Sequence, residues 1–290
     1  MGNDGQNIFI NLREQVYSQD INSFFPGWEK GNERVAVFSP HDDDALIGAG
    51  YAISAAMAEG AEVFIVIFCQ GDCGYSVPEQ KDTIVDIRRK ENISSYGSLG
   101  IPAKNIIRFE YPDFSVVNRE GYHLPGGGTG SFPLIFDLIR EHKITRVLVP
   151  NDYREHIDHT AAFNMASYDI VQAGDPIISD KGQPQKVKSI HQYSVWADFS
   201  PEDMLVTALD RDSIRANRAI LCPSSVEDNI RVAIEKFESQ GQIIQDLVKS
   251  REERFTGNGY IELYIEFDPR PKLDFAPYID HVNRIIDDRK

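Results

Sequence analysis

Short, nearly continuous apolar runs alternate with longer helical segments between residues 34 and 175. The runs resemble strands that are buried on both faces of a parallel sheet, and they occupy residues 35–38, 62–68, 105–109 and 145–150. The segments that follow them have helical spacing or small-residue composition, and they occupy residues 48–59, 82–99, 132–142 and 160–172. Four such alternations predict an α/β fold with a Rossmann-like, doubly wound and mostly parallel sheet.

The regions that flank this core, 34–175, are less regular. Residues 1–33 form an N-terminal extension with a short helical pattern at 8–17, and we expect it to pack against the core. No linker is long or polar enough to separate a second domain, so the sequence predicts one domain over 1–290 whose part 176–290 completes the sheet and roofs the site. In that part we expect a strand at 190–196, helices at 213–221 and 226–255, an edge or antiparallel strand at 260–267 and a helix at 277–288.

Polar clusters follow the first and the fourth predicted strands. They read His41-Asp42-Asp43-Asp44 and His156-Ile157-Asp158-His159. The carboxyl ends of parallel strands share one rim of the sheet, where ligands of such folds bind. Two imidazoles and a carboxylate with an open fourth position are the ligand set of catalytic zinc. Taken alone, the first cluster could equally be an acidic surface turn that caps a helix.

Together, the two clusters resemble the motifs of the PIG-L/LmbE-like family of zinc-dependent deacetylases, which remove N-acetyl groups from N-acetylglucosamine-type substrates. That family carries His-Pro-Asp-Asp after its first strand and His-Pro-Asp-His later. The resemblance extends over roughly residues 34–165. Further matches are Gly71-Asp72-x-Gly74, Arg88-x-x-Glu91, Pro112-Asp113 and, in the C-terminal region, Phe237-Glu238-Ser239-Gln240.

Carried over residue by residue, the resemblance implies a zinc site and its base. The metal ligands would be His41, Asp44 and His159, and Asp43 would be the general base that deprotonates the zinc-bound water. His156, as an imidazolium, would stabilise the oxyanion of the tetrahedral intermediate.

Three further positions have roles implied by the same resemblance. Asp158 would orient an imidazole and keep it charged. Arg88 and Asp113 would hold sugar hydroxyls. Read from the residues alone, Arg88 could instead pair with Glu91 at i,i+3, and Asp113 could be a turn residue.

The motifs also depart from the family at three positions. Asp42 and Ile157 replace the two prolines, so both turns lose a rigid φ angle. Asp42 adds a third carboxylate, which could tighten cation binding or move the ligand assignment by one residue, and its role stays unassigned. Glu155 stands where a glycine is usual, and we expect it to narrow or acidify the rim of the site.

Composition limits the partners of the protein. The chain has 290 residues and a net charge of −15 without a basic run, which gives no electrostatic support for binding nucleic acid or an anionic membrane. Because no secretory signal or spanning segment is visible, we expect a soluble, cytoplasmic protein. Cys69, Cys73 and Cys222 are expected to be structural thiols, with a 69–73 disulfide possible. Gly126–Gly128 lacks phosphate-binding spacing and is interpreted as a lid or turn.

The sequence therefore predicts a zinc-dependent hydrolase that removes the acetyl group from a small N-acetylated amino sugar or glycoconjugate. Its partner would be that small molecule, and a homo-oligomer is possible. One alternative is a Mg²⁺-dependent, phosphotransfer-type acidic site, since consecutive aspartates also suit hard cations. Another is a non-catalytic, sugar-binding domain on the same fold.

Overall fold

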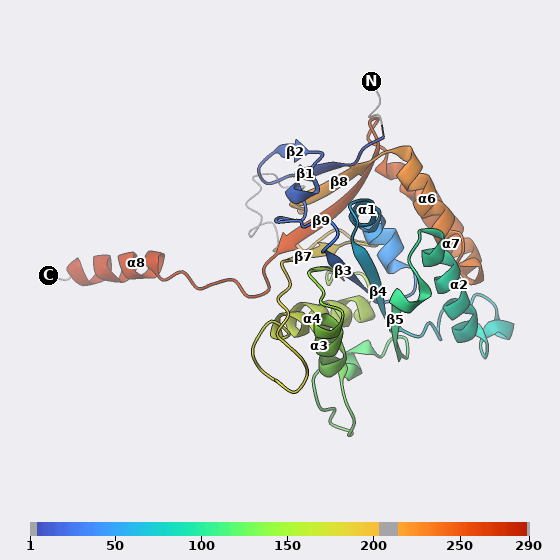
Figure 1. The fold of residues 1–290 in the computed structure, drawn as a ribbon, viewed down its shortest axis with the longest axis horizontal. Coiled ribbons are helices and arrows are strands. Elements are labelled where there is room, and N and C mark those ends of the chain that lie inside the picture. The colour runs from blue at the N-terminus through green and yellow to red at the C-terminus, as the bar shows by residue number, and fades with distance from the viewer. Residues whose placement is uncertain (1–4, 203–213, 289–290) are drawn as a thin grey trace.

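Nine strands form one sheet among residues 5–202 and 214–288, which are the residues that the computed structural model describes. The strand order is β2-β1-β8-β9-β7-β6-β3-β4-β5 (Figure 1). The segment from β7 to β5 is parallel, and the other four strands join it antiparallel. The strands are β1 (Ile8–Asn11), β2 (Val16–Ser18), β3 (Arg34–Ser39), β4 (Glu62–Cys69), β5 (Ile106–Tyr111), β6 (Arg146–Pro150), β7 (Ser189–Tyr193), β8 (Arg218–Cys222) and β9 (Tyr260–Phe267).

Helices cover both faces of this sheet (Figure 1). On β3, Val35 and Val37 pack with α1 and α6, whereas Ala36 and Phe38 pack with α3 and α4. Both faces of the central strands are therefore buried, which explains their continuous apolar runs. The helices are α1 (Asp44–Ala58), α2 (Ile84–Ser98), α3 (Ser131–Glu141), α4 (Ile157–Gln172), α6 (Ser224–Ile234), α7 (Gly241–Ser250) and α8 (Ala276–Asp287).

The predicted α/β class and its four strand–helix alternations are confirmed. Helices α1 and α4 begin earlier than expected, because residues of both polar clusters form their first turns. His156 is the N-cap of α4, and its Nδ1 accepts a hydrogen bond from the Asp158 N–H. The clusters are thus held between the end of a strand and the start of a helix.

Three predictions outside that core are wrong, and a fourth is confirmed in one of its two alternatives. Residues 8–17 form strands β1 and β2, because Ile8 to Asn11 pairs antiparallel with β8. The predicted helix 213–221 contains β8, although residues 203–213 lie outside the described part of the chain. The predicted helix 226–255 is interrupted near Gly241, whose φ of +42° is not helical. The strand predicted at 260–267 as an edge or antiparallel strand is β9. It lies between β7 and β8 and pairs antiparallel with both, so the antiparallel alternative is confirmed.

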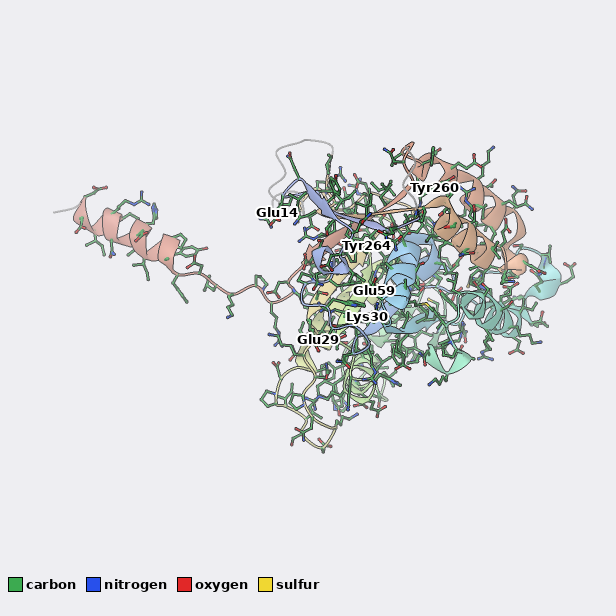
Figure 2. All side chains as sticks on the ribbon, turned by 45° about the horizontal axis from the view of Figure 1, so that its top comes forward. Glu14, Glu29, Lys30, Glu59, Tyr260 and Tyr264 are labelled. Atoms are coloured by element: carbon green, nitrogen blue, oxygen red, sulfur yellow. The ribbon has the colours of Figure 1, made fainter. Side chains whose placement is uncertain are left out.

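The N-terminal extension packs on the body of the fold as expected. Phe24 and Phe25 are fully buried in the core. Lys30 Nζ lies 3.3 Å from a carboxylate oxygen of Glu59 at the end of α1, and both residues are labelled in Figure 2. In contrast, α8 stands away from the body at the end of an extended arm (Figure 1). In the described part of the chain no helix has the length and apolarity needed to cross a bilayer.

The cysteines and the glycine-rich segment have structural positions. All three cysteines are free thiols, so the possible 69–73 disulfide is not formed, and Cys69 and Cys222 are buried. The segment around Gly127 closes as a turn in which the Gly127 N–H donates to the Leu124 carbonyl at 2.9 Å. A bridge between His123 and Thr129 completes this turn, which agrees with the expectation of a turn there.

A buried histidine on β7 is expected to make stability depend on pH. His191 is fully buried and stacks on Phe24 with ring centroids 4.2 Å apart. Burial, assisted by the charge of Arg218, lowers its pKa from 6.5 to about 3. As the pH falls below 6.5 the unfolded chain binds a proton that the folded chain does not, so stability decreases. Relative to a His191→Phe variant, the wild type should lose about 2 kcal/mol between neutral pH and about pH 5 in urea unfolding experiments. Parallel pH profiles for the two proteins would contradict this.

Candidate metal centre

The two polar clusters meet at the carboxyl ends of β3 and β6, which are neighbouring parallel strands. From β3 the chain adds β4 and β5 on one side of the sheet and later β6 and β7 on the other side. At such a switch point a crevice that can hold a ligand forms outside the carboxyl ends of the strands. The ring centroid of His41 lies 5.4 Å from that of His159 and 4.8 Å from that of His156. The prediction that the two clusters share one rim of the sheet is therefore confirmed.

The atoms of His41, Asp44 and His159 that could bind a metal all lie within 4.8 Å of one another. Asp44 Oδ2 is 3.1 Å from both His41 Nδ1 and His159 Nε2. Although His159 Nε2 is this close to Asp44 Oδ2, it makes no hydrogen bond among the described residues, and neither does the buried Asp44 Oδ1. Unpartnered buried polar atoms are costly, and a cation between them would satisfy both, so these three residues fit a metal ion.

The charges of this group are arranged around Asp44. Burial opposes the ionisation of Asp44, but His159 and His41 hold its pKa well below the usual range. Burial alone would lower the pKa of His159. The Asp44 and Glu155 carboxylates have the larger, opposite effect and raise this pKa to about 9. Positive charge is therefore favoured at the position that a cation would take.

A second group, His41, His156 and Asp158, has similarly close ligand atoms but fits a metal less well. Both carboxylate oxygens of Asp158 already accept backbone N–H groups, from Phe114 at 2.6 Å and from Val116 at 3.1 Å. Asp158 Oδ2 also lies 3.5 Å from His41 Nε2. Asp158 thus lies beside the His41 ring, and its role in orienting an imidazole stays a prediction.

Asp43 lies next to the candidate metal-binding group, His41, Asp44 and His159, but is not part of it. Its side chain is nearly buried, and one oxygen is 3.6 Å from Arg88 Nη2. Burial raises the pKa of Asp43; Arg88 opposes this, whereas Asp44 and Asp42 add to it. A carboxylate with a raised pKa is a better proton acceptor near neutral pH.

His156 is arranged as a neutral hydrogen-bond donor. Burial and the nearby His41 lower its pKa. Because Nδ1 accepts the Asp158 N–H, the neutral ring carries its proton on Nε2. The resemblance implies an imidazolium here, whereas this geometry supports a neutral Nε2–H that can still donate to a developing oxyanion.

Asp42, which the sequence left unassigned, is a fully buried anchor of the turn. Its carboxylate accepts hydrogen bonds from Arg88 Nε at 2.8 Å, from Arg108 Nη1 and from Asn92 Nδ2. Asp42 therefore faces the helix α2 and the strand β5 rather than the metal-binding group. Gly71 at φ +81° belongs to the same packing, because a Cβ there would lie 2.7 Å from Asp42 Oδ2.

The predicted sugar-binding residues Arg88 and Asp113 both lie near the site, and their side chains bond to other groups of the protein. Arg88 is 1% exposed and binds Asp42 and Asp43, not Glu91. Asp113 accepts the N–H groups of Gly71 at 2.9 Å and Cys73 at 3.0 Å. These contacts shape the loop after β4, and a role of either residue toward substrate stays a prediction.

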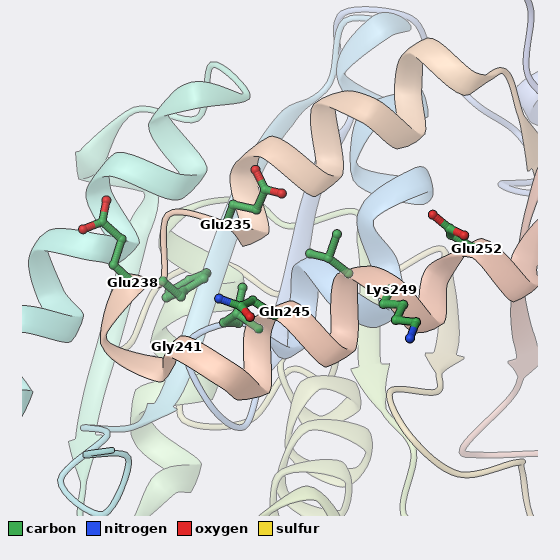
Figure 3. A pocket seen from close by; sticks show the side chains of 9 residues that line it. Glu235, Glu238, Gly241, Gln245, Lys249 and Glu252 are labelled. Atoms are coloured by element: carbon green, nitrogen blue, oxygen red, sulfur yellow. The ribbon is translucent and has the colours of Figure 1, made fainter. Parts of the chain in front are cut away.

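The C-terminal motif around Phe237 packs on the Arg88 helix. The Arg88 guanidinium lies over the Phe237 ring at 5.2 Å, and Glu91 accepts the Ser239 N–H at 2.7 Å. Phe237 also lines a separate cavity of about 590 Å³ beside α7 (Figure 3). That cavity is bordered by Glu235, Glu238 and Glu252 and contains none of the candidate metal-binding groups found among the described residues.

Glu155 adds no exposed charge to the rim, and whether it narrows the rim stays a prediction. Its carboxylate is fully buried, with Oε2 2.7 Å from His159 Nδ1. Burial opposes its ionisation, but His159 and the backbone donor Ala197 lower its pKa. Two exposed aromatic residues that the sequence did not single out border the histidines. The Phe114 ring lies 4.7 Å from His156, and the Trp196 ring lies 5.4 Å from His159.

Comparisons with known proteins agree with this description of the fold and the motifs. Residues 36–168, which include both polar clusters, match the PIG-L family model, described as GlcNAc-PI de-N-acetylase. The resemblance to that family is therefore confirmed over this segment. No curated protein sequence matches the chain.

Three solved structures share the fold at low sequence identity. The conserved protein TT1542 from Thermus thermophilus has a TM-score of 0.60 and 22% identity, with 82% of this chain and 96% of that chain covered. N,N'-diacetylchitobiose deacetylase from Pyrococcus horikoshii has a TM-score of 0.56 and 19% identity, with coverages of 86% and 92%. GalB, the 4-carboxy-2-hydroxymuconate hydratase from Pseudomonas putida, has a TM-score of 0.58 and 19% identity, with coverages of 84% and 100%.

Proposed function

We propose that the protein is a metal-dependent hydrolase that removes the N-acetyl group from a small N-acetylated amino sugar or glycoconjugate. The observation that carries the proposal is the group His41, Asp44 and His159, with Asp43 directly beside it. Two imidazoles and one carboxylate favour Zn²⁺ over Mg²⁺, which prefers an oxygen-rich set. The Mg²⁺ alternative therefore receives less support from these side chains.

The neighbouring side chains have the chemistry that amide hydrolysis requires. A bound Zn²⁺ would supply Lewis acidity, lowering the pKa of a water and polarising the acyl carbonyl. Asp43 can accept the proton of the attacking water and return it to the departing amine nitrogen. The His156 Nε2–H can donate to the oxyanion that forms on the carbonyl. Acetate and a free amine are the products.

The choice of an N-acetyl substrate rests on similarity. The matching family model is described as a de-N-acetylase, and one structural neighbour is a chitobiose deacetylase. Another neighbour is a hydratase, so the fold by itself does not determine the reaction. The proposal therefore depends on the side chains around His41 and has to be tested by product analysis.

A product assay with metal add-back tests the function. Protein treated with a chelator should release no amine from N-acetylglucosamine or N,N'-diacetylchitobiose, and added Zn²⁺ should restore equal amounts of amine and acetate. Mg²⁺ should not restore activity, because the histidines are poor ligands for it. Amine release is read with an amine-reactive fluorophore, and acetate is read by NMR.

Three results would contradict the proposal. Amine release that is insensitive to chelation would exclude the metal, and restoration by Mg²⁺ alone would favour the acidic-site alternative. Sugar binding without amine release at any metal concentration would instead indicate a non-catalytic binding domain.

A further inference from the structure

The carboxylate of Glu155 connects a candidate metal ligand to a distant turn of the chain. Oε2 lies 2.7 Å from His159 Nδ1, on the side of the ring opposite the atom that faces Asp44. Oε1 accepts three successive backbone N–H groups, from Val195 at 2.8 Å, Trp196 at 2.9 Å and Ala197 at 3.0 Å. The Ser194 hydroxyl donates to the same oxygen at 3.1 Å.

Such a carboxylate holds both partners firmly. Hydrogen bonds to an ionised acceptor are stronger than neutral ones, and three converging N–H groups form a site for an anion. The side chain is fully buried, so water does not compete for these bonds. Removing it would leave the turn 194–197 without its central acceptor and His159 Nδ1 without its partner.

The turn carries an aromatic side chain to the metal centre. Trp196 is 55% exposed, and its ring lies over His159 at a centroid distance of 5.4 Å. Its indole therefore offers a flat apolar surface beside the candidate metal ligand, of the kind that lines small-molecule sites. Glycine, which is usual in the family at position 155, has no side chain that could make this connection.

We propose that Glu155 is a positioning residue that joins the metal ligand His159 to the turn 194–197, so that metal binding and the placement of Trp196 are coupled. A carboxylate on the far nitrogen of a ligating histidine holds the ring orientation and leaves Nε2 available for the metal. The coupling is reciprocal: if the position of the turn 194–197 changes the affinity of His159 for the metal, metal binding must in turn change the preferred position of the turn. The inference rests on the proposed metal centre, but its tests need no turnover.

The first test measures metal affinity. Zn²⁺ titration of the chelator-treated protein, with a competing indicator, should show affinity lower by roughly 10–100-fold in Glu155→Gly and also reduced in Glu155→Gln. Glutamine retains an oxygen acceptor for the turn but loses the charge, so it also shows whether the glycine variant merely fails to fold. Asp152→Asn is the matched control, because Asp152 bonds Gln192 at 2.9 Å from the same loop and has no described contact with His159.

The second test follows the turn directly by fluorescence. The chain has two tryptophans, so a Trp28→Phe background leaves Trp196 as the sole reporter. Zn²⁺ should change the emission of Trp196 in this background, and the change should be lost when Glu155→Gly is added. Circular dichroism of each variant checks that the fold is retained.

The outcomes separate this inference from the proposed function. Wild-type protein that binds no Zn²⁺ would overturn both. If the Glu155 variants bind Zn²⁺ as tightly as the wild type, and Trp196 in the Trp28→Phe background responds to Zn²⁺ equally with and without Glu155→Gly, only the positioning role is overturned. A loss of affinity in Asp152→Asn equal to that in Glu155→Gln would likewise overturn it, because a general charge effect would then explain both.

Discussion

Asp43→Asn is expected to lower the rate of amine release by about 10²–10⁴-fold, the range typical of a lost general base. The substitution keeps the shape of the side chain but replaces the carboxylate by an uncharged amide, which cannot act as a base. The Asp43 carboxylate is nearly buried and lies beside Asp44 without belonging to the close metal-binding group. Zn²⁺ affinity should therefore stay close to that of the wild type, while kcat decreases.

Asp44→Asn provides the matched comparison for this experiment. Asp44 contacts both His41 and His159 at 3.1 Å, so its loss should reduce Zn²⁺ affinity together with activity. Kinetics on chelated and Zn²⁺-loaded samples, with direct metal titration, distinguish the two variants. Full activity in Asp43→Asn, or equal loss of metal in both variants, would assign the roles of these carboxylates differently.

The sequence predicted the position of the site because local patterns carry that information. A continuous apolar run ending in His41-Asp42-Asp43-Asp44 locates a strand end, and the same holds for the run before His156. Parallel strands then place both clusters at one rim without knowledge of any side-chain contact. Strand β8 was missed because Arg218–Cys222 is short and buried, with no two-residue alternation to distinguish it from a helix.

The contacts that organise the site could not be read in the same way, because they depend on tertiary register. Arg108 reaches Asp42 because β5 pairs with β4 in a register that sets Arg108 opposite Ile67. Glu155 reaches Trp196 because the end of β7 lies beside the loop that follows β6. Neither register is encoded in the residues near the motif, so a third aspartate and an unusual glutamate gave no local sign of their partners.

Asp42→Asn is expected to reduce the free energy of unfolding by about 3–5 kcal/mol, because it removes one partner of a buried ion-paired group. Asp42 is fully buried and faces the guanidinium groups of Arg88 and Arg108. Arg88 keeps a contact to Asp43 at 3.6 Å. Arg108 keeps the Glu110 carboxylate at 3.1 Å and the carbonyls of Cys69 and Gln70 at 3.3 and 3.1 Å. The substitution thus leaves buried positive charge without its main counter-charge, and the turn that carries the metal-binding group loses its anchor.

Urea unfolding of metal-free protein, followed by circular dichroism, measures this loss without a contribution from bound metal. Asp43→Asn is the control, because it also replaces a buried aspartate of the same turn by its isostere. This substitution relieves repulsion from Asp44 and Asp42, so the Asp43→Asn protein should be at least as stable as the wild type. Adding Arg108→Met to Asp42→Asn should recover much of the loss, because removing the unpaired charge removes its desolvation cost. If Asp42→Asn unfolds at the wild-type urea concentration, the buried charges do not depend on Asp42. The third aspartate would then have to be explained by the metal rather than by the fold.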